Sequence, residues 1–357
     1  MTLPHDGADA GTVDFASGLP ADAEFCLLEP QPVEFFTENF WFTAYDSGND
    51  IALMVHLGAD IEDWGLWAEK VYLVLPGGDE VLLAQGDGQL ATREAPAGSN
   101  LRFTCIEPFL RWHVRYDGRV ELNRTADLMR GPASASRRER AEIDLDIEAL
   151  TPAWIAGRGS ADEARQMQEQ QWGSSHYDQL FRFSGQLRYA GRSWTLDGTG
   201  FRDHSVGPRN FAPFGGHVLM AVYFPSGRAV GINAHRSVTR DVTMAAGYTI
   251  SKEGRIHHGS VRSAPWLERV GPPGEPLHFE IETDEGIVTI EGETLRNVWL
   301  TLQVPNGIAF GVDLANPERI NVCEAHSRLT WDGEDGLGIC ERSSLTRHLT
   351  TPSATSA

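Results

Sequence analysis

Positive charge is scarce in this sequence, and no cluster of basic residues offsets the shortage. Lysine and arginine together number 30 in 357 residues, against 50 aspartate and glutamate residues, so the formal net charge is −20 at pH 7. The longest basic run is the pair Arg137-Arg138. A surface of this charge repels nucleic acid and anionic membranes, so we expect neither as a partner. A neutral or apolar small molecule fits the charge better than a phosphorylated one.

The chain also lacks long apolar segments and closely spaced cysteines. Apolar runs such as residues 218–224 are far shorter than the about 20 residues of a membrane-spanning helix. Residues 1–9 have neither the basic start nor the apolar stretch of a secretory signal. The four cysteines are scattered along the chain, at Cys26, Cys105, Cys323 and Cys340. These absences predict a cytoplasmic protein with reduced thiols and no membrane span.

Motifs of the common cofactor-dependent enzymes and serine hydrolases are missing as well. Gly198 and Gly200 lack the third glycine and the following helix of a dinucleotide fingerprint. The segment Ser174-Ser175-His176 is not part of a Gly-x-Ser-x-Gly nucleophile elbow. His235 and the pair His257-His258 lack the carboxylate–histidine spacing of a metal site, so we interpret them as solvated loop histidines. We therefore predict no cofactor and no metal.

Short strand-like alternation interrupted by turn residues dominates the sequence, which is typical of antiparallel sheets and barrels. Turn residues separate pairs of such segments, and we expect β-hairpins, at residues 46–49, 117–118, 190–191, 225–227 and 284–286. One stretch, residues 161–172, is helical in pattern, with Ser160 as its N-cap and Gly173 at its end.

The length exceeds what one core usually organises, so we predict two β-barrel-like halves joined by this helical connector. The expected boundaries are a disordered leader (1–20), an N-terminal barrel-like domain (21–150), the connector (151–175), a C-terminal domain (176–347) and a disordered tail (348–357). The sequence leaves a homodimer open.

The densest group of polar side chains lies in the segment 197–210. In a regular strand neighbouring side chains point to opposite faces, so Arg202 and His204 would share one face and Asp203 the other. A buried aspartate keeps its proton to higher pH and can then act as a general acid, which makes Asp203 the first candidate for that role. The alternative is a structural Asp203 that accepts hydrogen bonds from Arg202, Arg209 or backbone amides.

This segment resembles the Gly-rich Asp-His signature of the carotenoid hydratase (hydroxyneurosporene synthase) superfamily, through Asp197-Gly198-Thr199-Gly200-Phe201-Arg202-Asp203-His204-Ser205-Val206-Gly207. Further similar elements are His176-Tyr177-Asp178-Gln179, Cys323-Glu324-Ala325-His326 and Gly336-Leu337-Gly338-Ile339-Cys340-Glu341. A tryptophan commonly follows the His-Ser step in such motifs, whereas this chain has Val206. The resemblance implies two tandem lipocalin-like antiparallel β-barrels, and a superfamily that includes hydratases and Diels-Alderases acting on hydrophobic molecules.

The resemblance also implies roles for individual residues. Asp203 or His204 would donate a proton to an alkene, His176 would join them in catalysis, and water would capture the cation. The residues expected to bind substrate are Tyr177, Gln179, Phe201, Arg202, Arg209, Trp299, Glu324 and Glu341. These roles predict a cofactor-independent lyase or isomerase of the hydratase or dehydratase type, acting on a terpenoid, steroid or aromatic. The alternatives are a lipocalin-like protein that binds such a ligand unchanged, and a pericyclase.

Overall fold

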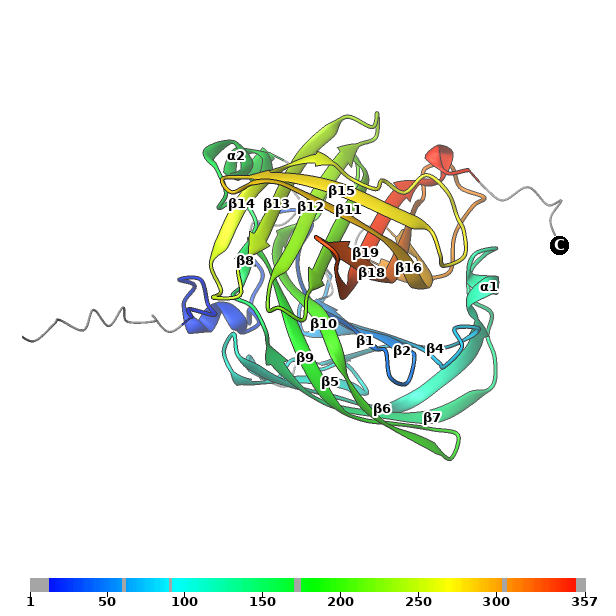
Figure 1. Ribbon diagram of the computed structural model, residues 1–357. Coiled ribbons are helices and arrows are strands. Elements are labelled where there is room, and N and C mark those ends of the chain that lie inside the picture. Colours follow the sequence, from blue (N-terminus) through cyan, green and yellow to red (C-terminus); the bar gives the residue numbers. More distant parts are fainter. Residues whose placement is uncertain (1–12, 60–61, 90–91, 170–174, 304–306, 351–357) are drawn as a thin grey trace, which may run out of the picture.

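The computed structural model describes residues 13–59, 62–89, 92–169, 175–303 and 307–350. Most of these residues lie in antiparallel strands, which confirms the prediction of a mostly β protein. The strands form two sheets that pack against each other, with the first sheet below the second in Figure 1. The first sheet contains β1 (Phe36–Asp46), β2 (Ile51–Ala59), β3 (Leu66–Val74), β4 (Glu80–Gln89), β5 (Leu101–Glu107), β6 (Arg111–Arg124), β7 (Arg138–Ala149), β8 (Trp154–Ile155), β9 (Ser175–Tyr189) and β10 (Arg192–Pro208).

The second sheet is built from the remainder of the chain. It contains β11 (Phe214–Tyr223), β12 (Ala229–Ser237), β13 (Val242–Ile250), β14 (Ile256–Ser263), β15 (Pro276–Thr283), β16 (Gly286–Gln303), β17 (Gly307–Phe310), β18 (Ile320–Trp331) and β19 (Glu334–Leu345). Helices in the described residues are short: α1 (Thr125–Leu128), α2 (Ala161–Glu169) and the 3-10 helices η1 (Ala21–Glu24) and η2 (Thr346–His348).

Each sheet closes into a ring. In the first sheet the pairing runs β10-β1-β2-β3-β4-β6-β7-β9 and returns to β10. In the second sheet it runs β15-β14-β13-β12-β11-β19-β18-β16 and returns to β15. Closure pairs both edges of these strands, so the rings present few unpaired backbone groups to other chains.

The two sheets divide the chain near residue 208, whereas the sequence predicted a division at residue 176. β9 pairs with β7, and β10 pairs with β1, so both strands complete the first ring. The predicted helix does form as α2, and Ser160 caps it through a 3.1 Å bond from the Glu163 amide. In the chain, however, α2 connects β8 to β9, which both belong to the first sheet. The chain passes between the sheets at residues 209–213 instead. Strand alternation is the same in either sheet, so only distant pairing partners decide membership.

Four of the five predicted hairpins form, at the turns after β1, β9, β11 and β15. The fifth prediction is wrong, because β6 runs straight through Asp117-Gly118. A side chain at Gly118 would lie 2.5 Å from the Tyr116 hydroxyl and 2.9 Å from Asn100. Glycine is therefore required here by close packing in the strand and not by a turn.

Strands that lie where the two sheets pack together are buried on both faces. Their sequences are therefore apolar at consecutive positions and not only at every second one. Every residue of β1 is buried: Phe40 and Phe42 belong to the core inside the first ring, while Trp41 and Tyr45 belong to the core shared with the second sheet. β11 is buried almost throughout as well. The contact between the sheets is thus a continuous core, and polar side chains within it are shielded from water.

The chain ends are ordered further out than predicted. Within the expected leader, Phe15 and Leu19 pack against Phe109 and Tyr177, and the Phe15 carbonyl accepts a 2.9 Å bond from Ala153. Residues 1–12 and 351–357 lie outside the described residues. All four cysteines are free thiols. None of the helices in the described part of the chain has the length and hydropathy needed to span a bilayer.

Candidate active site between the two sheets

β10 turns its charged residues alternately inward and outward, as the alternation in the sequence predicts. Arg202 and His204 point into the first ring, and Asp203 faces the second sheet. The glycines before them allow β10 to lie close to β1: a side chain at Gly200 would lie 2.4 Å from the Thr43 carbonyl oxygen, and one at Gly198 would lie 2.3 Å from that of Tyr45. These glycines therefore serve strand packing rather than ligand approach.

The inward residues form a buried network in which each charge has a partner. The Arg202 guanidinium donates to Glu24 at 2.8 Å, and His204 Nε2 lies 2.8 Å from Glu38. Tyr177 donates to Glu24 and lies 3.2 Å from His204 Nδ1. Burial raises the pKa of Glu24, but the charge of Arg202 and the hydrogen bonds from Tyr177, Arg202 and the Phe109 backbone together outweigh burial, so this pKa lies below its usual value. This network anchors η1 to the barrel and is built for stability.

The outward residues line a cavity of about 100 Å³ between the two sheets. Asp203, His176 and Arg209 come from the first sheet and the link that follows it, and Glu324 and Glu341 come from the second sheet. The remaining lining residues are Asn39, Trp41, His56, His217, Leu219, Asn233, His235, Leu300, Leu302, Ile308 and Val322. Five residues named by the sequence analysis therefore meet at one place, although they are far apart in the chain.

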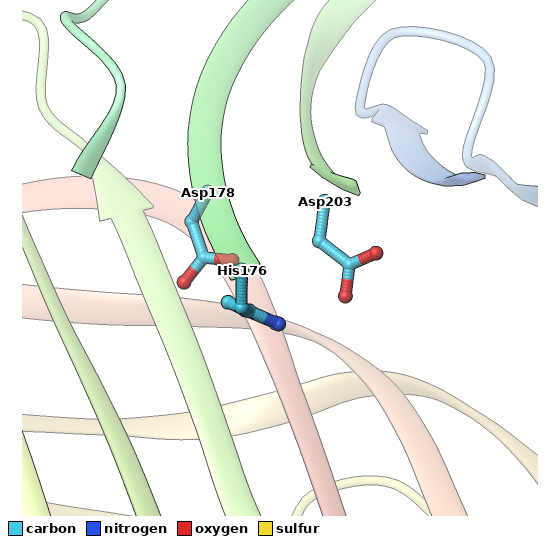
Figure 2. A group of neighbouring side chains, drawn as sticks. All are labelled: His176, Asp178 and Asp203. Carbon is cyan, nitrogen blue, oxygen red and sulfur yellow. Dashed lines mark hydrogen bonds and ion pairs between the residues drawn. The ribbon is translucent and has the colours of Figure 1, made fainter. Parts of the chain in front are cut away.

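Asp203 belongs to a three-residue group on the first-sheet wall, in which His176 lies between Asp178 and Asp203 (Figure 2). Asp178 lies opposite Asp203 in the β9–β10 pairing, and its Oδ1 is 2.6 Å from His176 Nε2. Asp203 is 8% exposed, and its Oδ1 has no hydrogen-bond partner; neither has Oδ2 of Asp178. One potential ligand atom from each of the three residues lies within 4.8 Å of the others, so the group could also hold a divalent cation.

Electrostatics in this group favour a proton on Asp203. Burial raises its pKa to about 6; the charge of His176 lowers that pKa and the charge of Asp178 raises it. Burial lowers the pKa of His176, but the charges of Asp178 and Asp203 outweigh burial, so this pKa is raised. An aspartic acid with a pKa near 6 can donate a proton close to neutral pH.

The second-sheet wall carries another pair of carboxyl groups. Glu324 and Glu341 are direct partners in the β18–β19 pairing. Burial and the neighbouring charge of Glu341 raise the pKa of Glu324 well above its usual value. His217 Nε2 hydrogen-bonds to Glu341, and its Nδ1 lies 2.6 Å from the Ser343 hydroxyl. The cavity thus has one carboxyl group that holds a proton beside a carboxyl–imidazole pair that can accept one.

The other predicted site residues lie elsewhere. Tyr177, Gln179, Arg202 and His204 belong to the inward network and are not among the residues that line the cavity. Phe201 packs on Trp41 with ring centroids 5.6 Å apart, in the core between the sheets. Trp299 is buried next to Leu300, but only Leu300 reaches the cavity, because neighbouring strand residues face opposite sides.

Several residues of the site were not predicted from the sequence. Asp178, which contacts His176 behind the cavity lining, could have been found, since it is two residues from His176 and therefore on the same strand face. His217 has no local signal, because its partner Glu341 is more than 100 residues away. The interpretation of His235 and His257 as solvated is wrong: both are buried in strands, His235 lines the cavity, and His257 lies 2.9 Å from Asp284.

Comparison with solved structures shows the same fold in proteins of very different sequence. A candidate AttH protein of Nitrosomonas europaea matches with a TM-score of 0.57 at 12% identity, covering 86% of this chain and 92% of that one. Kievitone hydratase from Nectria haematococca matches with a TM-score of 0.53 at 10% identity, covering 94% and 96%. CghA in complex with Sch210972 matches with a TM-score of 0.51 at 10% identity, covering 93% and 97%.

These likenesses confirm the antiparallel β-barrel fold that the resemblance implied, which this chain shares with kievitone hydratase and CghA. At such low identity they show the fold alone. No curated protein matches the chain. One family model matches residues 26–346, nearly the whole length, and the chain therefore belongs to the family described as "Domain of unknown function (DUF7064)".

Proposed function

We propose that this protein is a lyase or isomerase of the hydratase or dehydratase type, which moves a proton at a double bond of a hydrophobic small molecule. The observation that carries the proposal is Asp203: a buried carboxyl group with one oxygen unpartnered, facing a cavity. Such a group retains its proton near pH 6 and can give it to a carbon that water would protonate only slowly.

In the hydration direction, Asp203 transfers its proton to one alkene carbon and a C–H bond forms. The other carbon becomes cationic, and the Trp41 ring, which lines the cavity, would stabilise it by about 0.5–2 kcal/mol through a cation–π contact. A water molecule then forms the C–O bond and gives its extra proton to Glu341, which His217 supports by a hydrogen bond. Dehydration is the same sequence reversed.

His176 and Asp178 serve as positioning residues for the acid. The positive charge of a protonated His176 stabilises the Asp203 carboxylate that remains after transfer, while Asp178 fixes the ring through its 2.6 Å bond. Kievitone hydratase, one of the similar structures, is by name a hydratase, which supports this reaction class. CghA supports the broader idea that this fold hosts chemistry on hydrophobic molecules.

The test is turnover of a panel of terpenoid, steroid and prenylated aromatic alkenes and alcohols, followed by mass spectrometry in H₂¹⁸O. We expect one compound to gain or lose water, and the Asp203→Asn variant to be slower by about 10²–10⁴-fold. Asp197→Asn is the matched control, because Asp197 is an exposed aspartate on the same strand. Undiminished turnover by a folded Asp203→Asn variant would remove the acid from the mechanism. Recovery of every ligand unchanged would favour a binding protein.

A further inference from the structure

A second hollow adjoins the central cavity and differs from it in chemistry. This hollow, here called the vestibule, has a volume of about 320 Å³. Its apolar lining consists of Phe35, Phe211, Phe214, Val238, Ile320 and Leu345. Phe214, Ile320 and Leu345 form a small apolar cluster separate from the two large cores. Arg209 and Leu302 line both hollows, so the two adjoin at these side chains.

The sizes of the two hollows decide how a substrate can lie. Small-molecule sites usually enclose about 300–1,000 Å³, whereas the central cavity has about 100 Å³. The central cavity therefore has room for a reacting double bond and a water molecule, but not for a whole terpenoid, steroid or prenylated aromatic. The vestibule has the volume for the remainder of such a molecule.

Charged residues at the vestibule already have partners within the protein. The Arg319 guanidinium donates to Asp313 at 3.2 Å, and Glu318 is paired with Arg347. Arg209, where the two hollows meet, donates to the Ser205 hydroxyl. Because Arg319 and Glu318 have ionic partners and Arg209 is hydrogen-bonded, an uncharged apolar group can enter the vestibule without removing water from an unpartnered charge.

We propose that the vestibule binds the uncharged, non-reacting apolar body of the substrate, while the double bond lies beside Asp203 in the central cavity. Arg209 and Leu302 would contact the substrate between its two parts. This inference rests on the proposed function for the identity of the ligand, but the binding site itself can be tested without turnover. It defines the substrate class as molecules with a compact alkene or alcohol end and a larger neutral ring or branched chain.

The probe for this test is N-phenyl-1-naphthylamine, a neutral apolar fluorophore, titrated into the full-length protein. Ala212 is exposed and lines the vestibule, so Ala212→Trp fills the hollow without disturbing a core. We expect Ala212→Trp to weaken probe binding by about tenfold or more, a change of about 1.4 kcal/mol. Ala135→Trp is the matched control: Ala135 is also an exposed alanine, but it lines a separate groove of about 800 Å³ beside Arg138 and Phe310.

The outcomes separate this inference from the reaction. Equal probe affinity in wild type and Ala212→Trp, or loss in Ala135→Trp instead, would overturn the vestibule assignment. Asp203→Asn should bind the probe as wild type does, because Asp203 does not line the vestibule. If Ala212→Trp no longer binds the probe while Asp203→Asn keeps full turnover, the vestibule is supported as a binding site and Asp203 is excluded as the proton donor. Circular dichroism and unfolding curves confirm that each variant is folded.

Discussion

The inward and outward faces of β10 hold charged residues one position apart, yet they treat charge in opposite ways. Inside the first ring, Arg202 is ion-paired with Glu24, and His204 Nε2 lies 2.8 Å from Glu38. On the other face, Asp203 has an unpartnered oxygen and a pKa raised to about 6. An unpaired buried polar atom costs about 1–3 kcal/mol. Nη1 of the inward Arg202 also lacks a partner, but that guanidinium is ion-paired with Glu24. This contrast is our reason for proposing the outward face as the site of chemistry.

The largest expected effect on stability comes from a substitution of Glu24 in the inward network. Replacing Glu24 with Gln leaves the Arg202 guanidinium buried, at 2% exposed, without its ionic partner. Removal of one partner from a buried pair costs about 3–5 kcal/mol, and we expect a loss of this size in the free energy of unfolding measured in urea. Asp117→Asn breaks the exposed pair with Arg140 and should cost no more than about 1 kcal/mol. Similar small losses in both variants would show that the inward network does not stabilise the fold.

The sequence predicts the features of β10 that depend on neighbouring residues, but not those that depend on residues far away in the chain. Alternation is local, so the opposite faces of Arg202 and Asp203 were predictable from the sequence. The burial of Asp203, on which its role as an acid depends, is known only from the structure. The partners on each face come from distant segments: Glu24 from the N-terminal 3-10 helix and Glu341 from β19. Local pattern carries no information on such pairings.

The predicted connector shows the same limit. The helix at Ala161–Glu169 was recognisable from its N-cap and composition, but its place in the topology was not. Strand β9 was assigned to the wrong half because its alternation fits either ring, and only its pairing with β7 fixes it in the first. For the same reason Tyr177 and Gln179 were grouped with a site that the opposite face of their strand forms.

The stability of the protein should depend on pH through Asp203, on the outward face of β10. The folded-state pKa of about 6 lies above the ordinary 3.8, so the folded protein binds this proton more tightly than the unfolded chain does. The resulting stabilisation is complete below about pH 4 and is lost as the pH rises through 6, a change of about 3 kcal/mol. Asp203→Asn removes this dependence, so the variant should gain about that much relative to wild type between pH 4 and pH 8.

Urea unfolding of both proteins at the two pH values measures this difference. Other titrating groups contribute equally to wild type and variant, so they cancel to first order. Asp197→Asn on the same strand should leave the difference near zero, because Asp197 is exposed. A difference near zero for Asp203→Asn as well would mean that its carboxyl is solvated or ion-paired in solution. The same pKa predicts that turnover in the hydration direction falls above about pH 6, as Asp203 loses its proton.

The smallest expected effect comes from added metal, and it tests whether a proton or a cation neutralises the outward group. His176, Asp178 and Asp203 have the donor atoms for a divalent cation. Burial lowers the pKa of His176, but the charge and hydrogen bond of Asp178, with a further contribution from Asp203, raise it overall, and a protonated imidazole has no lone pair for a metal. We therefore expect less than one equivalent of Zn²⁺ or Mn²⁺ to remain after equilibrium dialysis at pH 6, and turnover to be unaffected by EDTA. If one equivalent of metal remains bound to the wild type and none to His176→Gln, then a metal ion and not a proton neutralises Asp203. The contrast between the two faces of β10 would then be one between an ion-paired network and a metal centre.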